Sequence, residues 1–172
     1  MPVSSPLGKS VVKGWWDAHK EIESVVDVGP GEGTYRKFLG KKKLWIGVEV
    51  WESYVEKYKL RDIYDKIIVG DITDIKLPTA DCIIFGDVLE HMEKQKALDL
   101  LAKAREKYPH IILSIPIGKY EQGALEGNPY EEHKSTWEFE ELNSLLADFE
   151  IKMLIPYCDT CPKDMGIGLF IK

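Results

Sequence analysis

The sequence predicts one α/β domain with a doubly wound, mixed sheet of about seven strands that ends in an antiparallel hairpin. Short apolar runs rich in Ile and Val alternate with longer amphipathic stretches, a pattern typical of strands and helices in turn. Near the end of the chain, two strand-like runs are separated by too few residues for a helix. The 172 residues, 44% of them hydrophobic, suit a single globular domain.

Five apolar runs are the expected parallel strands, because strands buried on both faces are continuously apolar. They lie at 25–26, 45–50, 67–69, 82–85 and 111–115. Two further runs, 150–157 and 166–171, form the expected antiparallel hairpin, since the short loop between them contains Cys, Pro and Gly.

Three stretches have helical spacing of their apolar residues: one in the N-terminal segment and two others over 94–108 and 137–149. Ser135 and Glu138 are spaced as a capping box for the last of these helices. We expect residues 1–22 to form an N-terminal helical cap on a core of residues 23–172. The long segment 116–134 lacks periodicity and is the expected lid, because such loops in compact domains are usually functional.

Charge and composition exclude several classes of function. The formal net charge of -6 disfavours general nucleic-acid binding, because excess acid repels phosphate groups. No apolar run is long enough to cross a bilayer, and the first ten residues lack a signal-peptide pattern, so we expect a cytoplasmic protein. Cys158 and Cys161 form half of a zinc motif without a second pair, so we expect no metal site.

The first strand runs into a turn with Gly29, Gly31 and Gly33, which is typical of nucleotide-binding loops at helix N-termini. A dinucleotide is disfavoured because Thr34 stands where the last glycine of the GxGxxG pattern would be. Asp27 and Glu32 would also repel a pyrophosphate. A ligand that carries an amine and a sulfonium fits better, and S-adenosylmethionine is such a ligand.

Two further acids follow successive strands on this side of the predicted sheet. Glu49 ends the second strand and is placed to accept both ribose hydroxyls, and Asp71 follows the third strand, where it can accept the adenine amino group. Trp51 and Ile72 are placed to pack on the base. Each acid alone reads equally well as a solvated strand end, but together with the glycine loop they favour a nucleoside site.

With these motifs, the chain resembles the class I S-adenosylmethionine-dependent methyltransferases of small-molecule type over nearly its full length. The resemblance rests on the segments 27–33 and 70–72, on Glu49, and on 85–91 after the fourth strand. It implies a Rossmann-like methyltransferase fold and methyl transfer to an O or N atom of a small molecule. The residues expected to bind S-adenosylmethionine are Asp27, Gly29, Gly31, Gly33, Glu49, Val50, Trp51, Asp71, Ile72 and Gly86.

The acceptor is expected beside the ends of the fourth and fifth strands. Asp87, His91 and His133 are the candidates for orienting or deprotonating it; Glu90 belongs to the same Asp87-x-x-Glu90-His91 motif. We expect Asn128, Tyr130 and Trp137 to contact the acceptor. His91 reads equally well as a residue of the next helix's first turn, and His133 also reads as an ordinary loop residue.

Two other functions remain open, because one fold hosts many activities. The acceptor could be a macromolecule, such as an RNA or a protein, or the domain could be a non-catalytic binding module.

Overall fold

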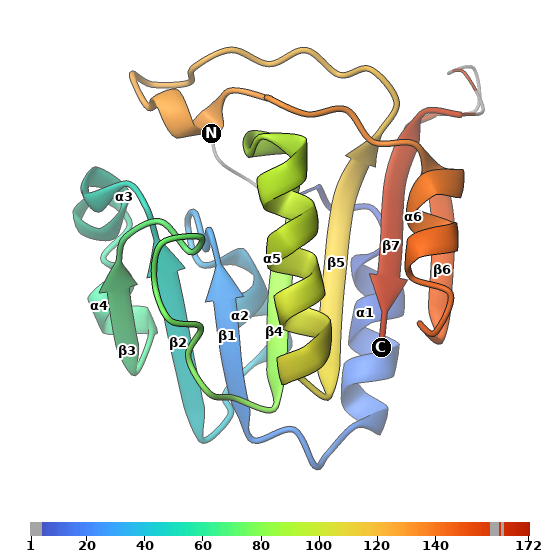
Figure 1. The fold of residues 1–172 in the computed structure, drawn as a ribbon. Helices are drawn as coiled ribbons and strands as arrows, with labels where there is room; N and C mark the ends of the chain where they lie inside the picture. Colours follow the sequence, from blue (N-terminus) through green and yellow to red (C-terminus); the bar gives the residue numbers. More distant parts are fainter. Residues whose placement is uncertain (1–4, 159–161, 163) are drawn as a thin grey trace.

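A seven-stranded sheet forms the centre of the computed structural model (Figure 1), which describes residues 5–158, 162 and 164–172. The strand order is β3-β2-β1-β4-β5-β7-β6. The strands are β1 (Ser24–Val28), β2 (Leu44–Glu49), β3 (Lys66–Val69), β4 (Cys82–Gly86), β5 (His110–Ile117), β6 (Ile151–Pro156) and β7 (Gly166–Ile171). The sheet confirms the predicted α/β class.

Helices cover both faces of the sheet. On one face lie α5 (Lys94–Lys107) and α6 (Phe139–Leu145), over a core that includes Phe85, Leu101 and Trp137. The other face packs against α1 (Lys9–Ala18), α2 (Thr34–Leu39), α3 (Glu52–Lys57) and α4 (Leu60–Ile63). Two short 3-10 helices, η1 (Leu89–His91) and η2 (Pro129–Glu131), lie beyond the ends of the strands.

The five parallel strands end at one edge of the sheet. Val28 at the end of β1 is in register with Val48 of β2 and with Phe85 of β4. Phe85 is in turn in register with Leu113 of β5. The residues that follow β1, β2 and β4 are therefore brought together at this edge, although they lie far apart in the sequence.

The C-terminal hairpin is antiparallel, as predicted, but its strands are not placed in chain order. The last strand, β7, inserts between β5 and β6, and Ile112 of β5 is paired with Ile171 of β7. β7 is buried along its whole length, which explains its continuous apolar sequence.

The predicted capping box is wrong. The Ser135 hydroxyl donates to the backbone carbonyls of Leu89 and Glu90, and α6 begins only at Phe139, with no side-chain cap. Ser135 therefore fixes the loop before α6 onto η1, instead of starting the helix.

The N-terminal helix is confirmed, with Trp15 and Trp16 buried against the sheet. Residues 1–4 of the predicted cap and Cys161 lie outside the described residues. Within the described part of the chain, every helix falls short of the length and apolar character that a bilayer crossing requires.

We expect Gly86→Ala to destabilise the fold by about 1–3 kcal/mol, because it overpacks the contact between β4 and α2. A Cβ atom at Gly86 would lie 2.2 Å from Cε2 of the buried Tyr35 ring. Urea denaturation measures the change. Gly14→Ala, in the exposed middle of α1 with nothing within 4 Å of its Cβ, is the control and should stabilise by about 0.5–1 kcal/mol. Equal unfolding midpoints for Gly86→Ala and the wild type would contradict this packing argument.

Candidate functional site

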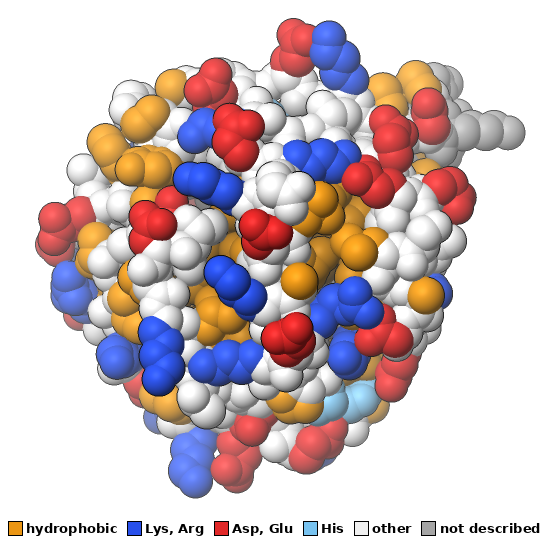
Figure 2. Space-filling model, in the orientation of Figure 1, with side chains coloured by type: hydrophobic (Ala, Val, Ile, Leu, Met, Phe, Trp, Pro, Cys, Tyr) orange, Lys and Arg blue, Asp and Glu red, His pale blue; other side chains and the backbone are white. Residues whose placement is uncertain are grey.

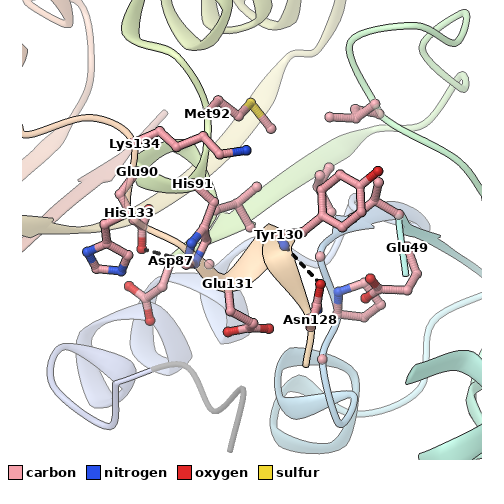
Figure 3. Close-up of a pocket in the computed structure, with 18 of the residues that line it drawn as sticks. Glu49, Asp87, Glu90, His91, Met92, Asn128, Tyr130, Glu131, His133 and Lys134 are labelled. Atoms are coloured by element: carbon pink, nitrogen blue, oxygen red, sulfur yellow. Dashed lines mark hydrogen bonds and ion pairs between the residues drawn. The ribbon is translucent and has the colours of Figure 1, made fainter. Parts of the chain in front are cut away.

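One cavity of about 500 Å³ opens at the carboxyl edge of the parallel strands. This volume is within the range of small-molecule sites. Its lining runs from Asp71 and Ile72 after β3, past the glycine loop, to Asp87, His91 and His133 (Figure 3). Most residues predicted from the sequence for the nucleoside and acceptor sites thus line a single cavity.

The glycine loop has a backbone that other residues adopt only with strain. Gly29, Gly31 and Gly33 have φ angles of +59°, +52° and +81°. Gly29 and Gly31 line the cavity, whereas Gly33 is absent from the lining and packs toward Ile63 instead. The Gly29 N–H donates to the Val48 carbonyl and the Gly33 N–H to the Pro30 carbonyl, which holds the loop in this shape at the cavity wall.

Asp27 lies near the end of β1 and is almost fully buried, with 1% of its surface exposed. The Tyr64 hydroxyl donates a 2.6 Å hydrogen bond to its Oδ2. Burial raises the pKa of Asp27 to about 7, although the hydrogen bond from Tyr64 opposes this shift. Tyr64 follows α4, and nothing in the local sequence signals its contact with Asp27.

Glu49 ends β2 and has 4% of its surface exposed. Its Oε1 accepts a 2.9 Å hydrogen bond from the Trp51 backbone N–H. Burial raises the pKa of Glu49 to about 7. A buried carboxylate at the cavity wall is suited to accept hydrogen bonds from ligand hydroxyls or to face a cation.

Asp71 closes the turn after β3. Its Oδ1 accepts hydrogen bonds from the backbone N–H and the hydroxyl of Thr73, both at 2.8 Å. Ile72 beside it is buried and lines the cavity, as do Val50 and Gly86. These residues therefore lie at the wall of the same cavity as Glu49.

Two tryptophans predicted for the site are placed differently. Trp51 is absent from the cavity lining and packs against the Tyr130 ring, with 5.9 Å between ring centroids. Trp137 is fully buried in the core beneath α5 and α6, where its indole N–H donates to the Ser135 hydroxyl at 3.0 Å. A residue enclosed by core side chains cannot contact an acceptor, so Trp137 has a packing role in this structure.

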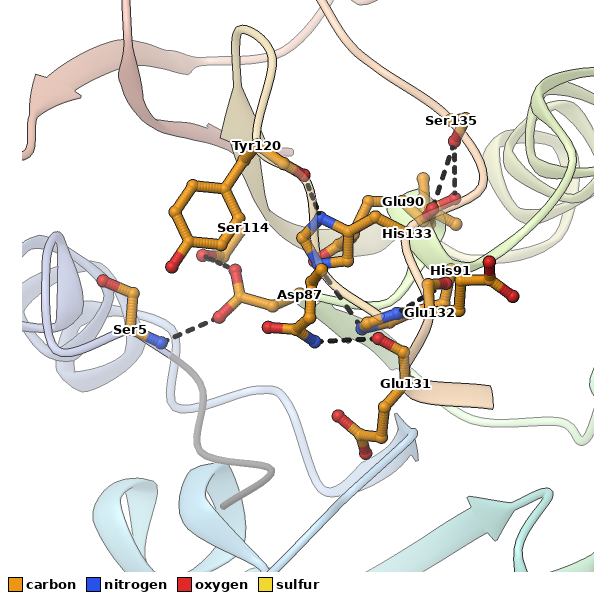
Figure 4. Close-up of polar contacts among 12 residues, drawn as sticks. Ser5, Asp87, Glu90, His91, Ser114, Tyr120, Glu131, Glu132, His133 and Ser135 are labelled. Atoms are coloured by element: carbon orange, nitrogen blue, oxygen red, sulfur yellow. Dashed lines mark hydrogen bonds and ion pairs between the residues drawn. The ribbon is translucent and has the colours of Figure 1, made fainter. Parts of the chain in front are cut away.

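Asp87 follows β4 in a left-handed conformation, with φ +58°. Such strain costs about 1–3 kcal/mol and is common at functional sites. Its carboxylate accepts hydrogen bonds from the Ser5 backbone N–H at 2.8 Å and from the Ser114 hydroxyl at 3.1 Å (Figure 4). The segment before α1 thus reaches the cavity, which the sequence did not reveal.

His91 and His133 lie together although 42 positions separate them, with 4.9 Å between their ring centroids. Nδ1 of His133 is 2.8 Å from the Tyr120 carbonyl oxygen, and Nδ1 of His91 is 3.3 Å from the Glu132 carbonyl oxygen. Since a carbonyl oxygen only accepts, each Nδ1 carries the proton and each Nε2 presents a lone pair. Burial lowers the pKa of His91 to about 4, so its ring is neutral at pH 7.

The loop after β5 lines the end of the cavity at which Asp87, His91 and His133 lie. Asn128 is 2% exposed, and its Oδ1 accepts from the Tyr130 N–H at 2.9 Å to begin η2. An ion pair between Lys57 and Glu126 fastens the loop to α3. The lining residues that sequence reasoning missed come mainly from distant segments: Ser5, Tyr35, Tyr54, Met92, Lys96 and Tyr157.

Comparison with known proteins finds a family match over the part of the chain that runs from β1 to β5. A family model described as "Methyltransferase domain" matches residues 26–111. No curated protein matches the sequence.

Solved structures share the fold at low identity. The N-terminal domain of EvdMO1 with SAH bound has a TM-score of 0.70 and 14% identity, covering 98% of this chain and 81% of that chain. Magnesium protoporphyrin IX methyltransferase (ChlM) from Synechocystis PCC 6803 has a TM-score of 0.65 and 15% identity, covering 95% and 80%. The small RNA methyltransferase HEN1 has a TM-score of 0.66 and 19% identity, covering 99% of this chain and 26% of that chain.

The family match spans half of the chain and runs from β1 to β5, which includes the glycine loop and both acids that follow β2 and β3. The sheet order, with antiparallel β7 between β5 and β6, agrees with the shared fold. The chain therefore belongs to the methyltransferase-domain family, and it shares its fold with methyltransferases solved with SAH bound.

Proposed function

We propose that this chain transfers the methyl group of S-adenosylmethionine to an oxygen or nitrogen atom of a small molecule. The observation that carries the proposal is one cavity that joins Asp71 and Glu49 at one end to Asp87, His91 and His133 at the other. This arrangement provides a nucleoside subsite and an acceptor subsite on either side of the glycine loop.

The cofactor subsite is assigned to residues at the strand ends. Glu49 accepts the ribose hydroxyls, and Asp71 with Ile72 binds the adenine. The methionyl part lies along Asp27, Gly29 and Gly31, with Val50 and Gly86 completing the wall. Gly33 and Trp51 act indirectly: Gly33 shapes the loop, and Trp51 supports Tyr130.

The acceptor subsite has to align the reacting atoms and exclude water. The cofactor supplies a methyl group activated by its positive sulfur. The lone pair of the acceptor atom forms the new bond to the methyl carbon while the carbon–sulfur bond breaks and its electron pair stays on sulfur. Asp87, His91 and His133 orient the acceptor, and an Nε2 lone pair accepts its proton if the acceptor arrives protonated.

A small acceptor is favoured because the loop covers this end of the cavity, with Asn128 and Tyr130 among the residues that line it. Figure 2 shows basic and acidic side chains interspersed on the face over α5 and α6, where the described residues form no continuous basic band. ChlM, a magnesium protoporphyrin IX methyltransferase, favours a small acceptor, whereas HEN1, a small RNA methyltransferase, favours RNA. The net charge of -6 weighs against RNA.

Thermal denaturation with S-adenosylhomocysteine or NAD tests the cofactor. At a concentration one hundred times its dissociation constant, S-adenosylhomocysteine should stabilise the fold by about 2.7 kcal/mol. NAD should give no comparable shift. No shift with S-adenosylhomocysteine, or a larger one with NAD, would reject the cofactor assignment.

Radiolabelled methyl transfer tests the acceptor. Panels of hydroxylated metabolites, small amines, RNA and peptides should give label only in the small molecules. Label only in RNA or peptide would establish the macromolecular alternative. Cofactor binding without transfer to any panel would favour the non-catalytic module.

Glu49→Gln should weaken S-adenosylhomocysteine binding by roughly 10- to 100-fold, because hydrogen bonds to a charged acceptor are worth about 1.5–3 kcal/mol. Isothermal titration calorimetry measures the loss. Glu52→Gln, in the exposed first turn of α3, is the matched control and should bind as the wild type does. The assignment fails if both variants bind equally well.

The affinity for S-adenosylhomocysteine should rise by about tenfold or more between pH 5.5 and pH 8. Because the pKa values of Asp27 and Glu49 are raised to about 7, both groups are mostly neutral acids at pH 5.5. The ionised forms, which accept ligand hydrogen bonds, predominate only above pH 7. Calorimetry across this range measures the slope, which Glu49→Gln should reduce; a flat profile in the wild type would contradict the linkage.

A further inference from the structure

Three side chains at the acceptor end have the composition of a metal site. Glu90, His91 and His133 each offer one ligand atom, and these atoms lie within 4.8 Å of one another. Glu90 and His91 come from η1, and His133 comes from the loop before α6. Figure 3 shows the three side chains close together beside the cavity.

Both imidazoles are oriented as metal ligands usually are. Each donates its Nδ1–H to a backbone carbonyl, of Glu132 for His91 and of Tyr120 for His133 (Figure 4). Such a bond fixes the tautomer and the ring, and leaves the Nε2 lone pair available to a cation. The carbonyls thus hold the two rings in orientations suited to a common ion.

The environment of Glu90 is a second indication of a cation site, independent of the orientation of the two imidazoles. It is 1% exposed, and its Oε2 has no hydrogen-bond partner among the described residues. Its Oε1 is 4.0 Å from Nε2 of His91, which is too long for a hydrogen bond. A buried carboxylate with an oxygen that lacks a hydrogen-bond partner costs several kcal/mol unless a cation compensates it.

We propose that Glu90, His91 and His133 bind a divalent transition-metal ion whose open positions face the acceptor. Ligand atoms about 2.1 Å from one tetrahedral ion lie about 3.4 Å apart, so the most widely spaced pair of the three has to approach by up to about 1.4 Å. Two imidazoles and one carboxylate favour zinc, iron, cobalt or nickel over magnesium or calcium, which prefer oxygen ligands.

The chemical consequence rests on the proposed methyl transfer. All three residues line the same cavity as Asp87, so the ion would bind an acceptor hydroxyl and lower its pKa as a Lewis acid. With both Nε2 lone pairs on the ion, neither histidine would accept the hydroxyl proton, which would pass to solvent instead. The oxygen would then attack the methyl carbon, and the carbon–sulfur bond would break as described above. This inference replaces the expectation from the sequence that the chain holds no metal.

Titration of the untagged, chelator-treated full chain with Co²⁺ tests the site without any need for turnover. We expect one ion per chain, with the weak visible absorption of nitrogen- and oxygen-bound cobalt. His91→Ala, His133→Ala and Glu90→Gln should each lower the affinity by more than roughly 100-fold, since even second-shell losses cost about 10- to 100-fold. His110→Ala is the matched control and should bind as the wild type does, because His110 lies at the amino end of β5, whereas the cluster lies beyond the carboxyl end of β4.

The titration also separates this inference from its alternatives. Intense thiolate-to-cobalt absorption, which would place the ion on cysteine sulfur, overturns the site, as does equal binding by the variants. If Glu90 is simply buried in its protonated form, the protein should not bind Co²⁺ at all, and that result also overturns the proposed metal site. Circular dichroism and S-adenosylhomocysteine binding by each variant must match the wild type, so that unfolding does not imitate ligand loss.

The outcome is independent of the proposed function. Co²⁺ binding that depends on the three residues supports the site even if no small molecule is methylated. Conversely, methylation by chelator-treated protein that neither binds Co²⁺ nor responds to it would retain the proposed function and reject the metal.

Discussion

The shared direction of five neighbouring strands is the constraint on which the site depends. The chain leaves β1 toward β2 and β3, then returns to the other side of β1 to form β4 and β5. The reversal creates a crevice between the ends of β1 and β4, where open α/β sheets bind ligands. In-register pairing places Gly29, Glu49 and Gly86 around this crevice. The fold thus positions the proposed cofactor site before any side chain contributes.

Buried carboxyl groups give this crevice its chemical character. Asp27, Glu49 and Glu90 are each less than 5% exposed, and burial raises the pKa of all three. Apolar cores on both faces of the sheet stabilise the fold sufficiently to hold them in place. A site of this kind is prepared for ligands that bring positive charge or hydroxyl groups, which compensate the loss of water around each carboxylate.

The acceptor end depends on contacts between η1 and the loop after β5. The Glu90 carbonyl accepts hydrogen bonds from the N–H groups of Lys134 and Ser135, and the Ser135 hydroxyl also contacts η1. These bonds bring His133 beside His91, while the Asp87 carboxylate is held by Ser5 and Ser114. The Glu90 carbonyl therefore anchors the loop after β5 and, through it, positions the two imidazoles. A change in the position of this loop would also move His133 relative to His91.

The alternation of strands and helices, the glycine turn, and the acids Glu49 and Asp71 could be predicted from the sequence, because periodicity and strand ends are local features of the chain. The insertion of β7, the burial of Trp137, and the hydrogen bonds from Tyr64 and Ser5 became evident only in the folded chain. The meeting of Glu90, His91 and His133 belongs to this second group, although the sequence had marked each residue. Each of these features is a contact between segments that are distant in the sequence. The loops between such segments have no periodic pattern, so their paths, and hence these contacts, could not be predicted from the sequence.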